Sequence, residues 1–261
     1  MPDDRIFTEQ ELDEFSKDFM GLAMEALESG DLEKAKYWIR RQDATKDMLH
    51  DLYLHWTTGL LSYIYDNWGE DAAVRAVRDT ATQGQSGFAV PMMKLKEQLM
   101  ATKGVKGYIQ GVIDIFRQHA LHPGITVEED DEKIILTAKQ CGSGGRLINM
   151  GAYEGPFGYR KLKKAGPHTW GEENLPIYCS HCAWVHEIIP LFYGGEGAQF
   201  WVHATPFPKK AGDPCVLHIY KDPKEIPNKY YERIGMTRER RVLPPTYGVD
   251  PKANKASKWP E

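Results

Sequence analysis

The hydrophobic pattern changes character once along this 261-residue chain, at Gly124. Before that glycine, apolar residues recur every three or four positions, which is the spacing of amphipathic helices. After it, short runs of β-branched and aromatic residues alternate with turn residues, as in antiparallel strands. The change predicts an α+β fold in which an N-terminal helical bundle layer packs on a C-terminal antiparallel sheet.

Glycine, proline and capping residues divide the helical half. A first helix is expected from the capping motif at Thr8 to Ser29-Gly30, and a second from Asp31 to Gly69, with Asp43 as a point where it can break. Further helices are expected over 70–82, 91–100 and 108–119, with a loop over 83–90. An apolar stripe of the second helix is expected to face the core; it includes Trp38, Leu49, Leu52, Trp56 and Leu60.

The second half predicts antiparallel strands with one helix among them. A β-hairpin is expected over 125–137, a helix over 182–192, and two more strands over 198–204 and 215–220. The connection over 142–176 has the length of a functional loop. We therefore divide the chain into a helical region (1–123), an antiparallel α+β region (124–235) and an extended C-terminal arm (236–261).

Composition excludes several classes of protein. Lys and Arg number 33 against 37 Asp and Glu, so a net charge of −4 provides no cationic field for nucleic acid. The longest apolar stretches are shorter than the roughly 20 residues that cross a bilayer, and the acidic N-terminus has no apolar segment behind it. We therefore expect a cytoplasmic protein with no nucleic-acid or membrane partner, whose four cysteines are reduced.

All four cysteines lie in the second half, each at the end of an expected element or in a turn beside one. Cys179-Ser-His-Cys182 has the C-x-x-C spacing with which two thiolates hold one tetrahedral ion. Because Cys141 closes the hairpin and Cys215 opens the last strand, neighbouring strands can bring both to this pair. We predict a cysteine metal site with one zinc ion per chain, held by these four thiolates. Four buried unreactive thiols, or a redox C-x-x-C without metal, are the alternatives.

Histidines close to these cysteines in the sequence offer other ligands and bases. Four sulfur ligands close a zinc site, whereas a catalytic zinc keeps one position open. His181, His186, His203 and His218 are available as substitute ligands or as groups that accept a proton. Among them, His181 is predicted to be catalytic. Glu187 is a candidate proton shuttle, with an exposed surface carboxylate as the default interpretation.

The run Cys141-Gly-Ser-Gly-Gly-Arg146 is the second motif. Its glycines allow positive φ and close backbone approach, so successive N–H groups can form an anion-binding nest in which Gly144 and Gly145 contact the substrate. Arg146 is predicted to clamp a carboxylate in a bidentate pair. In the alternative interpretation, the glycines only let Cys141 approach a metal. The two interpretations are compatible.

The helical half contains a polar set, His50-Asp51-Leu-Tyr-Leu-His55, inside an otherwise apolar helix. His50 and His55 are five residues apart and do not share a face, so this helix has no His-x3-His zinc motif. His50 and Asp51 are candidate catalytic residues if one of them faces a pocket as a base. In the alternative, they form hydrogen bonds between helices.

Two stretches of the chain resemble the family of L-2-amino-thiazoline-4-carboxylic acid hydrolase-like proteins. Residues 60–77, LLSYIYDNWGEDAAVRAV, are similar to that family's helix, Gly-Glu loop and following amphipathic helix. The second half is similar in its first Cys, its central Cys-x-x-polar step and its final Gly212-Asp-Pro-Cys-Val-Leu-His-Ile219 strand. The family often has Asp where this chain has Cys182, which keeps a metal ligand but changes its charge and softness, so the substrate need not be identical.

A more distant resemblance links the antiparallel α+β arrangement to vinyl-reductase-type small-molecule-binding domains, which are sensors and trafficking modules. The hydrolase resemblance implies an enzyme that cleaves a non-peptide C–N bond in a small cyclic amidine or heterocyclic carboxylate. In that hypothesis the zinc ion activates water, a neighbouring histidine takes the proton, and Arg146 with the glycines holds the carboxylate.

Two rival functions follow from the same residues. One is a non-catalytic small-molecule-binding or sensor protein with a structural four-cysteine zinc site. The other is thiol catalysis by Cys141 beside the glycines. In each case the ligand is a small molecule. The aromatic helical faces and the Arg-rich arm further predict a homodimer.

Overall fold

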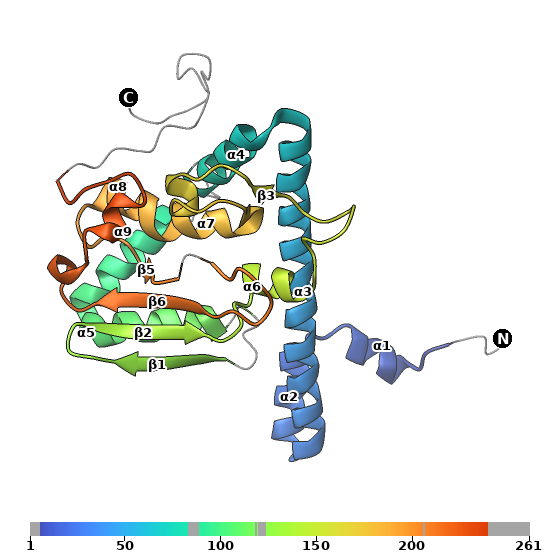
Figure 1. Cartoon of the computed structure of the whole chain (residues 1–261). Coiled ribbons are helices and arrows are strands. Elements are labelled where there is room, and N and C mark those ends of the chain that lie inside the picture. Colours follow the sequence, from blue (N-terminus) through green and yellow to red (C-terminus); the bar gives the residue numbers. More distant parts are fainter. Residues whose placement is uncertain (1–5, 83–88, 118, 120–123, 206, 240–261) are drawn as a thin grey trace. The chain divides into compact units, whose positions relative to one another are not determined.

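A computed structural model of the protein describes residues 6–82, 89–117, 119, 124–205 and 207–239. The chain divides into two compact units, Met1–Tyr53 and Leu54–Glu261, and the helix α3 (Leu32–Trp68) runs through the division (Figure 1). The first unit is helical, and the second contains the remaining helices and both sheets. The protein is therefore an α+β protein, as the change of pattern at Gly124 predicts.

The first unit begins with two short helices where one was expected. Thr8 caps α1 (Glu9–Phe15) in a capping box with Glu11, and Asp18 caps α2 (Phe19–Glu28) by accepting from the Gly21 N–H. The Asp18 cap explains the interruption, because an N-cap residue has extended rather than helical backbone angles. A small core follows around three residues, Leu22, Ala23 and Trp38.

The helix α3 differs from its prediction in two ways. It has 37 residues without a break at Asp43, and much of its apolar stripe is exposed rather than buried. Trp38 is buried, but Leu49, Leu52, Trp56 and Leu60 are each at least half exposed. A helix of this length spans about 55 Å, which is more than the core of a domain of this size can cover.

Two helices of the second unit follow their sequence signals closely. α4 (Glu70–Thr82) has the expected bounds. α5 (Ala89–Arg117) joins the two helices expected over 91–100 and 108–119 across a kink at Gly104, whose φ of 65° suits a residue without a Cβ. Of the loop expected over 83–90, residues 83–88 lie outside the described part, and 89–90 are helical.

A four-stranded antiparallel sheet has the order β1-β2-β6-β5. The predicted hairpin is formed by β1 (Ile125–Glu129) and β2 (Lys133–Ala138), and β6 (Cys215–Tyr220) has the predicted bounds. The strand expected over 198–204 is only β5 (Val202–His203). Ile134 and Leu136 pair with Ile219 and Leu217, and these four pack with Tyr108 and Val112 of α5, which covers that face (Figure 1).

The segment between the sheet strands is mostly structured. The connection expected over 142–176 contains α6 (Gly144–Asn149), a small hairpin of β3 (Lys161–Leu162) and β4 (Leu175–Pro176), and the turn η2 (Pro167–Thr169). After η3 (Ile177–Cys179), residues 180–194 form one continuous helix, here called the central helix. It comprises α7 (Ser180–Cys182), the π-helical segment η4 (Ala183–Ile188) and α8 (Ile189–Gly194). The chain continues to η5 (Pro223–Glu225) and α9 (Lys229–Glu232).

The central helix is the core of the second unit. Ala183, Trp184, Val185, Ile188 and Ile189 are at most 1% exposed, and the helix contacts α4, α5 and η2. The prediction of a helix over 182–192 is confirmed, but neither the burial of most of its side chains nor its π-helical turn was expected. Buried polar side chains of this helix lack contact with water, so they need hydrogen-bond partners, an opposite charge or a metal ion inside the protein.

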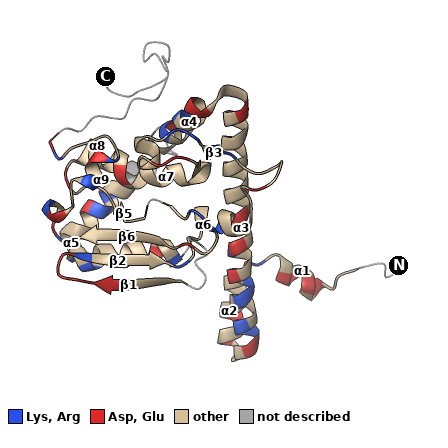
Figure 2. Cartoon of the chain, viewed as in Figure 1, with Lys and Arg blue, Asp and Glu red and all other residues tan. Residues whose placement is uncertain are grey.

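Charged residues do not separate into regions of one sign. Figure 2 shows basic and acidic residues following one another along α3, while the acidic pair of β1 forms a small exception. Among the described residues, no helix combines the length and the apolar composition that crossing a bilayer requires. Most of the expected arm over 236–261 lies outside the described residues, which end at 239.

Candidate metal centre

Pro190 distorts the central helix where the candidate metal ligands lie. Proline has no backbone N–H to donate to the carbonyl of residue i−4, and its ring crowds that carbonyl. That carbonyl belongs to His186, and it accepts a hydrogen bond from the Phe200 N–H at 3.0 Å instead. The preceding turn is π-helical, and the Ile189 N–H donates to the Trp184 carbonyl five residues back. Such turns are frequent at functional sites.

The distorted turn gathers His181, Cys182 and His186, here called the His–Cys–His triad. One ligand atom from each lies within 4.8 Å of the other two, and no other trio of His, Cys, Asp or Glu in the described part of the chain does this. Cys182 Sγ is 3.4 Å from His181 Nε2. His181 Nδ1 donates to the Tyr178 carbonyl at 2.6 Å, which leaves the Nε2 lone pair for a ligand.

Burial sets the protonation of the triad. It lowers the pKa of His181 to about 4 and holds the pKa of His186 well below its ordinary range, so both imidazoles are neutral at neutral pH. It also raises the pKa of the Cys182 thiol, with further contributions from Cys141 and Cys179. His186 Nδ1 is buried and has no hydrogen-bond partner among the described residues. A cation would both satisfy that nitrogen and stabilise the thiolate.

A buried ion-pair network lies on the other side of the triad. Glu187, fully buried, accepts hydrogen bonds from His203 Nδ1 at 2.7 Å and Trp170 Nε1 at 3.0 Å. Arg233 donates to both of its carboxylate oxygens, at 3.1 and 2.9 Å. Burial raises the pKa of Glu187, but Arg233 and His203 outweigh that effect and hold it below its ordinary value. The default expectation of an exposed carboxylate was therefore wrong.

Trp201 connects this network to the triad. Its ring lies 4.2 Å from the His186 ring, centroid to centroid, and its Nε1 donates to His203 Nε2 at 3.4 Å. His203 therefore donates from Nδ1 to a carboxylate and keeps Nε2 as an acceptor, and burial lowers its pKa so that the ring is neutral. Hydrogen bonds to Glu187 and Trp201 thus orient His203, and Trp201 also packs against the ring of His186.

Cys141 and Cys215 form a thiol pair beside the triad. The Cys215 thiol donates to Cys141 and lowers the pKa of Cys141 to about 6, against the opposing effect of burial. The backbone N–H groups of Gly145 and Ser143 stabilise the same thiolate. In turn, the hydrogen bond to Cys141 raises the pKa of Cys215. Within the pair, Cys141 is therefore the thiol that ionises more readily.

The predicted four-thiolate ion is not confirmed. All four cysteines lie within electrostatic reach of one another, because Cys141, Cys179 and Cys182 each act on the pKa of Cys215. The sheet and the central helix thus bring them into one region, as the positions of the cysteines in the sequence predict. At the closer spacing of metal ligands, however, the group contains Cys182 with two histidines and none of the other cysteines.

The glycine run beside Cys141 is shaped by close packing. A Cβ on Gly144 would overlap the Sγ of Cys179, and a Cβ on Gly145 would lie 2.8 Å from the Cβ of Cys141. Neither of these glycines has positive φ, nor does Gly142, so the expectation of left-handed backbone was wrong. Arg146 is partly buried on α6. Its predicted role as a carboxylate clamp stays a prediction.

His50 and Asp51 belong to the first unit, on α3. Both are partly buried there, and their predicted catalytic role stays a prediction. The neighbouring His55 belongs to the second unit, where its Nδ1 lies 2.8 Å from the Tyr159 hydroxyl.

Sequence reasoning missed Trp170, Trp201 and Arg233 as parts of the site. Arg233 follows a tyrosine-rich segment with no motif, and only the fold brings it to Glu187. One usable signal was present: Pro190 lies inside a predicted helix, and a proline there displaces the backbone four residues earlier. That position is His186.

Comparison with known families, curated proteins and solved structures finds no match to this chain. The resemblance to the amino-thiazoline-carboxylate hydrolase family therefore rests on the motifs alone. Metal binding is supported by the geometry of the triad instead.

Proposed function

We propose that this protein is a metal-dependent hydrolase that acts on a non-peptide C–N bond of a small cyclic amidine or heterocyclic carboxylate. The observation that carries the metal part is the His–Cys–His triad, whose ligand atoms lie within 4.8 Å of one another. The substrate class comes from the family resemblance. Three protein ligands with an open fourth position are the arrangement of catalytic rather than structural zinc sites.

The residues of the triad fit a zinc ion. Imidazole nitrogen and thiolate sulfur are the ligands that zinc prefers. The Tyr178 carbonyl fixes the ring of His181 with Nε2 free, and His186 has a buried nitrogen without a partner among the described residues. When bound, zinc lowers the pKa of a water molecule towards neutrality and polarises the bond that is to be cleaved.

His203 is the group proposed to accept the proton. Glu187 holds its Nδ1, so its Nε2 is the basic atom, and its ring centroid lies 6.2 Å from that of His186. To take up a proton, Nε2 has to give up the long 3.4 Å hydrogen bond that it accepts from Trp201 Nε1. Because burial keeps the imidazole neutral, it is in the form that takes up a proton. Arg233 balances the charge of Glu187. In the same proposal, Arg146 holds the substrate carboxylate beside Gly144 and Gly145.

A second candidate function is thiol catalysis by Cys141. The observation that favours it is the hydrogen bond from Cys215, which with two backbone N–H groups lowers the pKa of Cys141 to about 6 and so favours the nucleophilic thiolate. In this mechanism the thiolate adds to the amidine carbon, the ring C–N bond breaks and the freed nitrogen takes up a proton. Water then adds to the same carbon and breaks the new C–S bond, which returns the thiol. The two mechanisms share a substrate class and differ in which residue the turnover requires.

Metal binding is tested by titrating metal-free protein with zinc and with cobalt. His186→Ala and Cys182→Ala are expected to weaken binding more than about 100-fold, because each removes a ligand. Cys179→Ala is the matched control, since Cys179 is a neighbouring buried cysteine outside the triad. Loss of the ion in Cys179→Ala would instead favour the predicted four-cysteine site, and with it the sensor hypothesis.

Turnover is tested with 2-amino-thiazoline-4-carboxylate by following ring opening. The metal mechanism expects loss of turnover in His186→Ala and retention of some turnover in Cys141→Ser. The thiol mechanism expects the reverse, together with a mass increase on Cys141 when the reaction is quenched. If wild-type protein loaded with zinc opens no amidine ring of this class, the hydrolase proposal is wrong.

A further inference from the structure

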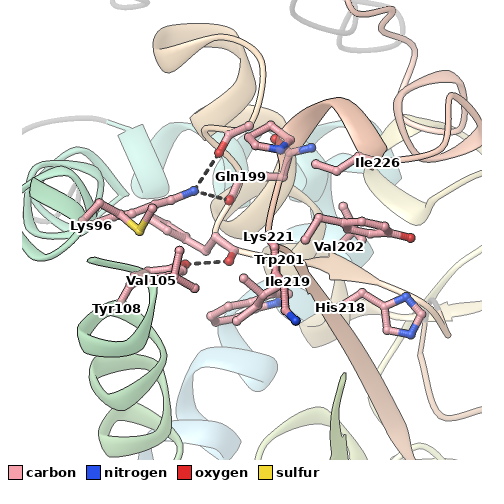
Figure 3. A pocket seen from close by; sticks show the side chains of 15 residues that line it. Lys96, Val105, Tyr108, Gln199, Trp201, Val202, His218, Ile219, Lys221 and Ile226 are labelled. Atoms are coloured by element: carbon pink, nitrogen blue, oxygen red, sulfur yellow. Dashed lines mark hydrogen bonds between the residues drawn. The ribbon is translucent and has the colours of Figure 1, made fainter. Parts of the chain in front are cut away.

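A cavity that opens to solvent lies between α5 and the sheet, separate from the triad. It has a volume of about 70 Å³ and is lined mainly by apolar and aromatic side chains, among them Tyr108 and Trp201 (Figure 3) together with Phe200. A second cavity of about 80 Å³ shares these three residues and Lys96 with it. No triad residue lines either space.

Two residues of α5 with polar groups, Lys96 and Tyr108, line both cavities. The Nζ of Lys96 donates to the carbonyl oxygens of Gly197 and Gln199, each at 2.7 Å (Figure 3). An ammonium group has three N–H bonds, and these two carbonyls take two of them. The Lys96 ammonium also lies 5.3 Å from the centroid of the Tyr108 ring, over its face. No carboxylate of the described residues is within ion-pair distance of Nζ. Burial accordingly lowers the pKa of Lys96 to about 8, with Glu97 opposing the shift from a distance.

The remaining lining favours an anion as well. None of the described lining residues is acidic, whereas Lys221 and His218 are among them. Lys221 is already paired with Glu129 at 2.7 Å, so Lys96 carries the charge that lacks a counter-ion. Gln199, only 5% exposed, also lines the cavity, and its Oε1 has no hydrogen-bond partner in the described part of the protein. Because an amide oxygen only accepts hydrogen bonds, it calls for a donor group on the ligand and does not contribute to binding the anion.

We propose that this cavity, here called the Lys96 cavity, binds a small aromatic carboxylate. The aromatic walls match a flat apolar body, and the third N–H of Lys96 matches the carboxylate in a charge-assisted hydrogen bond. Tyr108 contributes to the shape of the cavity rather than to recognition, because its hydroxyl already donates to the Phe200 carbonyl. The inference does not rest on the proposed hydrolase function, since it concerns binding alone.

The test compares two probes with one apolar body, 3-phenylpropanoate and 3-phenylpropan-1-ol, by calorimetry on the full chain. The carboxylate is expected to bind at least about tenfold more tightly than the alcohol, because hydrogen bonds to charged groups are the stronger ones. In Lys96→Met this preference should fall to within about twofold while the alcohol still binds. Lys94→Met, an exposed lysine on the same helix, is the matched control and should keep the preference.

The position of the ligand is tested separately, so that the outcome does not depend on Lys96→Met folding. In an NMR titration of the wild type, 3-phenylpropanoate should shift the indole N–H resonance of Trp201, assigned with Trp201→Phe. Equal affinity of wild type for the two probes would overturn the proposal. So would a carboxylate preference that survives in Lys96→Met, or binding that leaves the Trp201 resonance unmoved.

Discussion

Two helices of this protein carry a pair of histidines five residues apart, and only one pair converges. In α3, His50 and His55 lie on a regular α-helix, where side chains five residues apart point in directions that differ by about 140° around the helix axis. In the central helix, His181 precedes the π-helical segment and His186 lies within it, and there the backbone bonds to the fifth residue rather than the fourth. Their ring centroids are 6.0 Å apart.

The comparison shows that ligand spacing in a sequence has meaning only with the local helical period. Two histidines five residues apart cannot bind the same metal ion in α3, whereas in the central helix they can. What sets the period is not a histidine but Pro190, which removes one backbone donor and crowds the His186 carbonyl. Substitutions in and around the two helices test this contrast.

The largest effect is expected where the central helix is anchored. Glu187→Gln should lower the free energy of unfolding by about 3–5 kcal/mol, because it leaves the guanidinium of Arg233 with no opposing charge in a buried site. The control on α3 is Asp66→Asn, which breaks an exposed pair with Arg160 and should cost less than about 1 kcal/mol. Urea denaturation measures both. Equal costs would mean that the two helices are held in the same way.

The same carboxylate predicts an acid dependence. Since the pKa of Glu187 is lower in the folded protein than its ordinary value of 4.5, its stabilising contribution is complete above that value and is lost as the pH falls towards the folded pKa. Wild type should therefore lose more stability than Glu187→Gln below about pH 4.5. Parallel pH curves for the two proteins would show that Glu187 is not ionised in the fold.

Pro190→Ala addresses the comparison directly. With a backbone N–H restored, the central helix is expected to adopt the α-helical period of α3 and turn His186 away from His181. Zinc affinity should then fall by about 10–100-fold, the range seen when groups that orient ligands are removed. Pro223→Ala, at the start of η5, controls for loss of a proline as such. Unchanged zinc affinity in Pro190→Ala would remove the proline from the explanation.

Glycine-to-alanine substitutions should change the stability of the protein in opposite directions in the two regions. Gly144→Ala is expected to destabilise the protein by about 1–3 kcal/mol, because its Cβ would overlap the Cys179 sulfur. Gly59→Ala, in α3 with no atom closer than 3.8 Å to the new carbon, should stabilise it by about 0.5–1 kcal/mol. Thermal unfolding reports both, and a stabilising Gly144→Ala would contradict the packing described around the cysteines.

The smallest effect is expected at the non-converging pair. His50→Ala should change zinc affinity by less than about twofold, within the additivity expected of independent sites. A larger loss would show that α3 supplies a ligand after all, and would support the predicted catalytic role of His50 and Asp51. His181→Ala is the positive control in the same titration.

The sequence predicts the α+β class, α4, the hairpin and β6 correctly because each has both a period and a boundary signal. Apolar alternation with an Asp-rich turn defines β1 and β2, and Gly69 and the following acidic turn define the start of α4. The exposed apolar residues of α3 were misassigned because periodicity identifies a stripe without showing what covers it.

The sequence predicted where the candidate site lies but not which residues form it. Cysteines near strand ends and at a C-x-x-C pair did gather in one region. That His181 and His186, rather than three more cysteines, are the close neighbours of Cys182 depends on a π-helical turn that no spacing rule anticipates. Arg233 and Trp201 come from distant segments, and only the tertiary fold places them.

Trp201 has one further consequence. Its indole touches a histidine of the triad on one side and forms a wall of the Lys96 cavity on the other. A guest in the cavity that tilts this ring would alter how strongly the ion is held. Thermodynamic reciprocity then requires the ion to alter the guest's affinity by the same factor. Through the ring of Trp201, binding in the cavity and binding at the triad would thus each change the affinity of the other.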